Sequence, residues 1–127
     1  GGMQATIDPF LYDINITVQP QQTPDGILRT IEDEVKRLQD TLISPEEIAR
    51  AIKQARALFA YGSENITNQA FWMGYAEMFA KYEWFSNYVS NLEQVTPQDI
   101  QTTARVYLNP SRRVTGIYVP EPHKEKA

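Results

Sequence analysis

The chain has 127 residues, of which 42% are hydrophobic and 22% charged, and this length and composition predict one globular domain. Sixteen acidic and twelve basic residues give a net charge of −4, which disfavours a nucleic-acid-binding surface because such a surface needs clustered Lys and Arg. The sequence contains no cysteine, which excludes disulfides, thiol nucleophiles and Cys-ligated metals, and its one histidine, His123, lies in a charged tail.

The two ends of the chain differ in composition from its centre. Residues 1–4 begin with two glycines and are interpreted as a tag remnant or linker, which places the natural N-terminus upstream. Residues 5–120 are expected to form a single α+β domain, and residues 121–127 a short charged tail. No signal peptide is evident, and no apolar run approaches the ~20 residues of a membrane-spanning helix. The compartment is therefore left open.

A strand and a helix are the first expected elements. Apolar and polar residues alternate over residues 11–18, which predicts a strand with one polar face. Thr23 and Pro24 are typical of the N-cap and first residue of a helix. Helical spacing then predicts one apolar stripe, formed by Ile27, Leu28, Ile31, Val35, Leu38 and Leu42.

Two longer helical stretches follow in the middle of the chain. A capping box at residues 44–47 begins the second helix, and residues 62–65 predict a break after it. Its expected buried face consists of Ile48, Ala49, Ile52, Ala55, Leu58 and Phe59. The third stretch, which continues loosely to Asn87, has an apolar face of Phe71, Tyr75, Met78, Phe79 and Tyr82.

A short helix and a second strand are expected to complete the chain. Residues 96–99 resemble a capping signal, and Asn109-Pro110 ends the helix that follows. Its expected inner face consists of Ile100, Ala104, Tyr107 and Leu108. The β-branched segment 113–119 predicts a strand that ends at Pro120. Because two strands alone make a marginal sheet, the chain is expected to belong to a larger sheet-containing unit.

Carboxylates are the first candidates for acid–base chemistry in a chain without cysteine. Adjacent acids occur at residues 32–34 and 46–47, but neighbours on a helix point about 100° apart. Helix electrostatics and i,i+4 pairing account for both groups, so a solvated surface is the favoured interpretation. One histidine cannot form a zinc site of two or three imidazoles. We therefore assign no catalytic and no metal-binding residue.

Aromatic residues are the most distinctive feature of the sequence. Eight of the fourteen aromatics fall between residues 71 and 88, namely Phe71, Trp72, Tyr75, Phe79, Tyr82, Trp84, Phe85 and Tyr88. Core packing is the favoured interpretation for the residues of the helical stripe. Trp72 and Trp84 lie off that stripe, and two interpretations of them stay open: core packing, or the wall of an interface or substrate chamber.

The order and spacing of several weak motifs resemble the insulinase-like, or pitrilysin, zinc metallopeptidases, which include the mitochondrial processing peptidases. The family commonly shows Val-Thr-x-x-Asp-hydrophobic at a helix start, followed by Ala-x-x-Tyr-Leu. Those positions are here Val95, Thr96, Asp99, Ile100, Ala104, Tyr107 and Leu108. The upstream strand, the helix ending near Leu42 and the Ser-Pro-Glu-Glu-Ile helix start at residues 44–48 also resemble the family, so that the resemblance covers residues 8–120.

Departures from the family pattern bear directly on activity. The family acts through His-x-x-Glu-His with a downstream glutamate, a zinc ligand set that this sequence lacks. The resemblance therefore implies the later part of the C-terminal, non-zinc half, with zinc held by the N-terminal half or a partner subunit. It also implies an α+β fold, rich in helix, with helices packed on one face of an antiparallel sheet and truncated at its N-terminus.

Two classes of function compete. In the first, the chain is a non-catalytic portion of a peptide-cleaving metallopeptidase that helps to form the substrate chamber and packs against the zinc-bearing half. A stand-alone protein-interaction module, or a non-catalytic subunit of a processing-peptidase-like complex, is the alternative within this class. In the second, it is a small hydrolase that uses carboxylates or Tyr. The absence of cysteine and of embedded acid pairs favours the first class, and the chain alone is predicted to be inactive.

Self-association is the last expectation. An unpaired strand edge and an uncovered apolar sheet face are commonly covered by another chain. Trp72 and Trp84 would add aromatic area of the kind found at interfaces. We therefore expect a symmetric dimer through sheet edges or through the helical aromatic surface, with no nucleic-acid partner.

Overall fold

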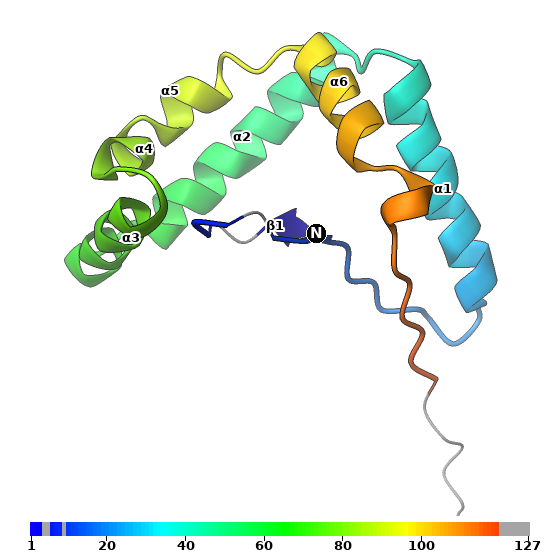
Figure 1. Cartoon of the computed structure of the whole chain (residues 1–127). Helices are drawn as coiled ribbons and strands as arrows, with labels where there is room; N and C mark the ends of the chain where they lie inside the picture. Colours follow the sequence, from blue (N-terminus) through cyan, green and yellow to red (C-terminus); the bar gives the residue numbers. More distant parts are fainter. Residues whose placement is uncertain (4–5, 9, 120–127) are drawn as a thin grey trace, which may run out of the picture.

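The computed structural model describes residues 1–3, 6–8 and 10–119 and is rich in helix (Figure 1). Two very short strands pair near the N-terminus, β1 (Gly2–Met3) and β2 (Tyr12–Asp13). The helices, in chain order, are α1 (Pro24–Asp40), α2 (Pro45–Gly62), α3 (Ile66–Phe79), α4 (Tyr82–Ser86), α5 (Tyr88–Leu92), α6 (Pro97–Tyr107) and the 3₁₀ turn η1 (Pro110–Arg112).

Side-chain caps set the helix starts where the sequence predicts them. The Thr23 hydroxyl accepts the Gly26 N–H at the start of α1, at 3.2 Å. Capping boxes form at Ser44 for α2 and at Thr96 for α6, each followed by proline. The predicted break is also confirmed, since α2 ends at Gly62 and Asn65 caps α3. These contacts are local, so they follow from sequence alone.

The strands differ from the prediction. Of residues 11–18, only Tyr12–Asp13 is paired, with Gly2–Met3, so part of the presumed tag remnant takes part in β1. Segment 113–119 contains no strand at all. The physical reason is that a strand needs a partner for its backbone groups, and in the described residues these two segments do not pair with each other. The confirmed architecture is therefore mostly α, with one small antiparallel pair.

The helices form an arch, which Figure 1 shows with its apex where α1 leads into α2 and α5 leads into α6. One lobe consists of α1 and α6, and the other of α2 to α5. The α1–α6 pair is joined by the Gln39 side-chain amide, which donates to the backbone oxygens of Ala104 at 3.1 Å and Leu108 at 2.9 Å. The Arg105 Nε in turn donates to the Gln39 backbone oxygen at 2.6 Å.

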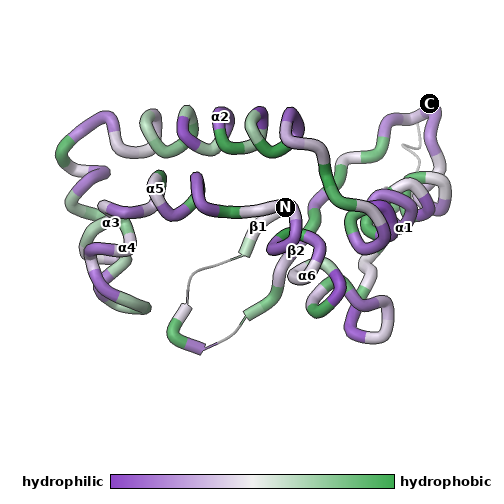
Figure 2. Tube along the Cα trace, turned by 90° about the horizontal axis from the view of Figure 1, so that it is seen from above, coloured by the Kyte–Doolittle hydropathy of each residue, from purple (hydrophilic) through white to green (hydrophobic). Residues whose placement is uncertain are grey.

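Very little of the described chain is fully buried. Among the described residues, only Ala76, Phe85 and Ala104 are buried hydrophobic residues, and the accessible surface of the chain is 10953 Å². A compact monomer of this mass exposes about 6,900 Å² by the usual scaling, so the excess is about 4,000 Å². Figure 2 shows hydrophobic residues along the helices of both lobes. The arch thus leaves uncovered much surface that a core would normally bury.

The predicted core stripes are correspondingly only partly covered. The first five residues of the α1 stripe are half-buried because α6 packs alongside, but Leu42 is exposed. Five further residues that the sequence predicts in the core are exposed: Ala49, Leu58, Phe71, Met78 and Tyr107. Tyr82 is likewise exposed rather than buried. The reason is that, in the part of the chain that the structure describes, no other element covers the sides of α2, α3 and α6 that carry these residues.

Candidate functional site

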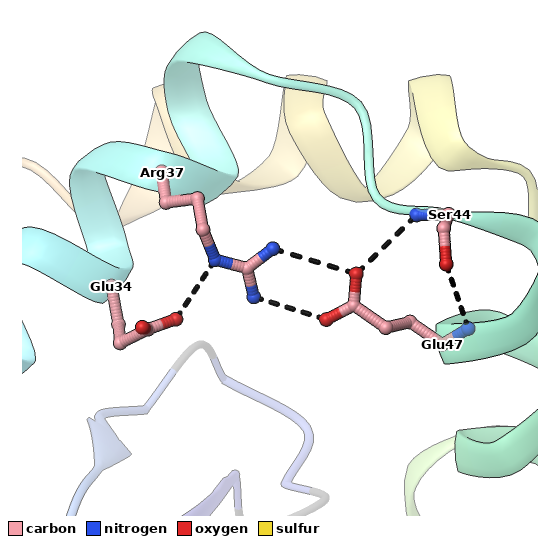
Figure 3. A network of polar contacts seen from close by, with 4 residues as sticks. All are labelled: Glu34, Arg37, Ser44 and Glu47. Carbon is pink, nitrogen blue, oxygen red and sulfur yellow. Dashed lines mark hydrogen bonds and ion pairs between the residues drawn. The ribbon is translucent and has the colours of Figure 1, made fainter.

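The strongest charged network lies at the corner between α1 and α2 (Figure 3). The Arg37 guanidinium contacts the Glu34 carboxylate at 2.9 Å and the Glu47 carboxylate at 3.1 Å. Glu47 also accepts the Ser44 N–H at 3.4 Å as part of the capping box. Glu34, and then Glu47, raises the pKa of Arg37, while Arg37 and the Ser44 N–H lower the pKa of Glu47. The network joins two helices through charge-assisted hydrogen bonds.

Two other carboxyl groups have shifted pKa values, and both lie at helix starts. Backbone N–H groups and the Ser44 hydroxyl lower the pKa of Glu46, and the Thr96 hydroxyl and N–H lower that of Asp99. A general acid at neutral pH needs a raised carboxyl pKa, which apolar burial would produce. All the resolved pKa shifts of carboxyl groups are downward and occur at exposed helix starts, so these carboxylates stabilise the helices and are not suited to act as general acids.

A metal site has no support in the residues that the structure describes. Within them, no group of three or more His, Cys, Asp or Glu side chains is placed to hold a metal ion. His123 lies outside the described residues. In the same described part, no helix has both the length and the apolar character needed to cross a membrane.

The aromatic residues form a continuous chain of ring contacts, which we call the aromatic ladder. On α3, Trp72 meets Tyr75 edge to face at 5.9 Å between ring centroids, and Tyr75 meets Phe79 at 5.4 Å. Phe79 then meets Trp84 of α4 at 5.1 Å, and Trp84 meets Tyr88 of α5 at 5.5 Å. Edge-to-face and tilted pairs at such separations contribute about 0.5–1.5 kcal/mol beyond their buried area. The ladder therefore joins three helices into one lobe.

Phe59 extends this ladder to α2. Its ring lies 5.0 Å from Phe85 and 5.2 Å from Tyr88. Phe85 is the one large side chain among the three buried hydrophobic residues. Phe59 was expected in the buried face of the second helix, but its place in the aromatic cluster was missed. No local sequence pattern predicts this contact, because Phe59 and Phe85 lie 26 residues apart in the sequence.

Trp72 and Trp84 occupy opposite halves of the ladder. Their exposed fractions are 39% and 42%, so each combines ring packing on one side with solvent exposure on the other. Phe71, assigned to the core stripe, is more exposed than either, at 61%. The distinction between stripe and off-stripe residues therefore does not separate buried from exposed rings in this lobe.

A shallow hollow lies beside the ladder. It measures about 320 Å³ and is lined by Thr6, Ile7, Asp8 and Phe10 from the N-terminal segment and by Tyr75, Met78 and Phe79 from α3. A second hollow of about 360 Å³ lies at the apex, between the start of α2 and the α5–α6 connection. Both are lined mainly by apolar side chains, so they fit apolar groups rather than ions.

Comparisons with known proteins give no relationship for this chain: no family model, no curated protein and no solved structure matches it.

Proposed function

We propose that this chain is a non-catalytic C-terminal portion of an insulinase-like zinc metallopeptidase. It contributes to the substrate chamber and packs against the zinc-bearing half or a partner subunit of the same kind. In the complete protein the helices pack on one face of an antiparallel sheet, whose other strands come from outside the described residues. The substrate is a peptide, and zinc, bound by the other half, supplies the activated water for hydrolysis.

The observation that carries this proposal is the exposed surface of the chain. Its accessible area exceeds that of a compact monomer of equal mass by about 4,000 Å². An excess of this size on one chain is more than one partner buries in most obligate interfaces, which is about half of a total of about 2,000–5,000 Å². A chain that contributes one wall of a larger body is expected to leave such a surface when it stands alone.

The character of α3 supports the same proposal. This helix has one charged residue, Glu77, and its carboxylate is occupied as the acceptor of the Tyr82 N–H at 2.8 Å. Its other polar residues, Thr67, Asn68 and Gln69, lie in the first turn, and a helix with so few polar residues along the rest of its length is typically buried within a larger protein. Here Ile66 and Phe71 are 82% and 61% exposed. The exposed side of α3 is therefore suited to form an interface with another part of the enzyme.

The potential metal-binding side chains of the described residues give no reason to place zinc in this chain. Its shifted carboxylates are committed to helix caps and to Arg37, and no suitable cluster exists among the described side chains. The role left to the chain is to bind and orient peptide. The ladder and the adjacent hollow supply an apolar wall, and Trp72 and Trp84 are its most suitable anchors because half-exposed tryptophans are enriched at binding hot spots.

Reconstitution tests the proposal. The chain is mixed with a zinc-bearing half from the same genome that contains His-x-x-Glu-His, and cleavage of a quenched fluorescent peptide is followed with and without a zinc chelator. We expect no zinc-dependent cleavage by the chain alone and restored cleavage by the mixture. Failure of the two parts to associate, or cleavage by the chain alone, would contradict the proposal.

Matched variants identify the surface involved. Trp72→Ser and Trp84→Ser should each weaken association with the zinc-bearing half at least tenfold, as interface tryptophans do when truncated. Gln54→Ser, at an exposed position of α2, is the control and should bind as the unmodified chain does. Far-UV circular dichroism establishes that all three variants keep their helices. Equal binding by all of them would remove the tryptophans from the interface.

A further inference from the structure

The segment of residues 114–119 is an extended length of chain with no backbone partner among the described residues. It follows η1 and leaves the α1–α6 lobe as a single trace (Figure 1). None of its backbone groups makes a hydrogen bond to another described backbone group. Val114, Ile117, Tyr118 and Val119 are 95%, 53%, 90% and 69% exposed. Residues 114–119 thus expose both apolar side chains and backbone groups that pair with no other described backbone group.

The root of this segment is held firmly. Arg113, which already has extended backbone angles, pairs with Glu32 of α1 at 2.7 Å. One turn earlier, the Asn109 side chain accepts the Ser111 N–H at 3.0 Å, and the Leu108 carbonyl is bound by Gln39. The segment therefore leaves the lobe at a defined point, and less entropy is lost when a partner strand pairs with it.

The residue pattern fits a strand and lacks the usual protection of an exposed edge. Four of the six residues are β-branched, and none is charged. Natural edge strands are commonly protected by lysine, by inward-pointing charge or by a bulge. Pro120, next in the sequence, has no N–H and limits the pairing on that side. The pattern thus favours a short segment of strand pairing within residues 114–119.

We propose that this segment pairs with the same segment of a second copy of the chain, as an antiparallel two-stranded ladder around a two-fold axis. An axis perpendicular to the ladder places a residue opposite itself, and Ile117 fits this position. Gly116 then lies opposite Tyr118 of the second copy, a pairing in which an aromatic ring covers a glycine. Thr115 lies opposite Val119, a β-branched pair. Each pair is formed twice, because the interface is isologous.

The area available is sufficient for such a dimer. A standard interface buries about 800 Å² per partner, and the excess of about 4,000 Å² that each chain exposes leaves surface beyond residues 114–119 that can add to the paired strands. A second copy also has matching chemistry, since an uncharged apolar edge is complementary to itself. The inference concerns the 127-residue chain and does not depend on the proposed peptidase role.

The two-fold axis makes the inference sharply testable. Ile117→Lys places two lysines directly opposite each other, and Ile117→Glu places two glutamates there, and both arrangements are repulsive. We expect the unmodified chain to sediment at twice its mass of 14.6 kDa at tens of micromolar. Each variant alone should be monomeric, with a dissociation constant raised more than tenfold. An equimolar mixture of the two variants should again form a dimer, because Lys then faces Glu.

Controls separate this surface from others. With Ile117 on the axis, Val114 would face Pro120, beyond the last of the three kinds of residue pair, so Val114→Lys should leave the dimer intact. Since residues 114–119 contact no helix through the backbone, helix content should be unchanged in all variants. A monomeric unmodified chain at every concentration would overturn the inference. So would a dimer that survives Ile117→Lys but is lost in Phe71→Ser, which would place the contact on α3, and so would a mixture that stays monomeric.

Discussion

Gln39 holds the α1–α6 lobe together, and its replacement gives a quantitative test of that lobe. Gln39→Met keeps the length of the side chain but removes both N–H donors to the carbonyls of Ala104 and Leu108. Each hydrogen bond contributes about 0.5–1.5 kcal/mol net, so losing two should lower the free energy of unfolding by about 2 kcal/mol. With a urea slope of about 1–3 kcal/mol/M, the midpoint should fall by roughly 1 M.

Gln39→Glu provides the matched comparison for this test. It has the shape of glutamine, but its carboxylate would face carbonyl oxygens at the C-terminus of α6, where negative charge is unfavourable by about 0.3–1 kcal/mol. Gln39→Glu should therefore be less stable than Gln39→Met. Urea titrations followed by circular dichroism at 222 nm, at one fixed protein concentration, measure both variants. Unchanged stability of Gln39→Met, or a Gln39→Glu variant that exceeds it, would refute the assignment of Gln39 as the tie between α1 and α6.

Three further predictions concern the caps, the charge network and the tryptophans. Asn65→Ala should lower stability by about 1 kcal/mol, as measured by urea unfolding, because Asn65 caps α3. The folded-state pKa of Glu47 lies below its ordinary value of 4.5, so its stabilising effect is complete above that pH and is lost as the pH falls through the folded value. In an acid titration followed by circular dichroism, Arg37→Gln should accordingly lose less helix than the unmodified chain; an identical loss would contradict the pairing. Trp72→Phe and Trp84→Phe should show similar acrylamide quenching of the remaining indole, since the exposed fractions are 39% and 42%; strong protection of one would be inconsistent with this structure.

The helices were predictable from sequence because their signals are local. Ser44 and Thr96 bond to groups three residues away, and the proline after each lacks the N–H that would be unpaired anyway. Strands depend on partners far along the chain or outside it. Segments 11–18 and 113–119 have suitable residue patterns, yet only residues 12–13 pair in the structure. A pattern of period two indicates which face a strand would present, but not whether a neighbour is there to pair with it.

The aromatic site was predictable in position but not in geometry. The concentration of rings between residues 71 and 88 was evident, and their mutual contact follows from that concentration. The exposures of Phe71 and Trp72 instead depend on the turn at residues 80–81, which brings α4 back against α3. That turn decides which side of α3 receives Trp84, and no spacing rule within α3 contains this information. Phe59 joins from α2 for the same non-local reason.

The apex of the arch has a mechanical consequence. Two short connections, residues 41–44 and 93–96, pass between the lobes, and of the ion pairs in the described part only Arg37–Glu47 joins one lobe to the other. Two adjacent connections can act as a hinge: they permit rotation of the lobes about the line through both connections and resist rotation about other axes. The two connections therefore constrain the opening angle of the arch least, and the Arg37–Glu47 ion pair is the charged contact that crosses the apex. A rotation of about 5° at the apex displaces the far end of α1, a helix about 25 Å long, by about 2 Å, so contacts between the lobes set the angle at which they stand.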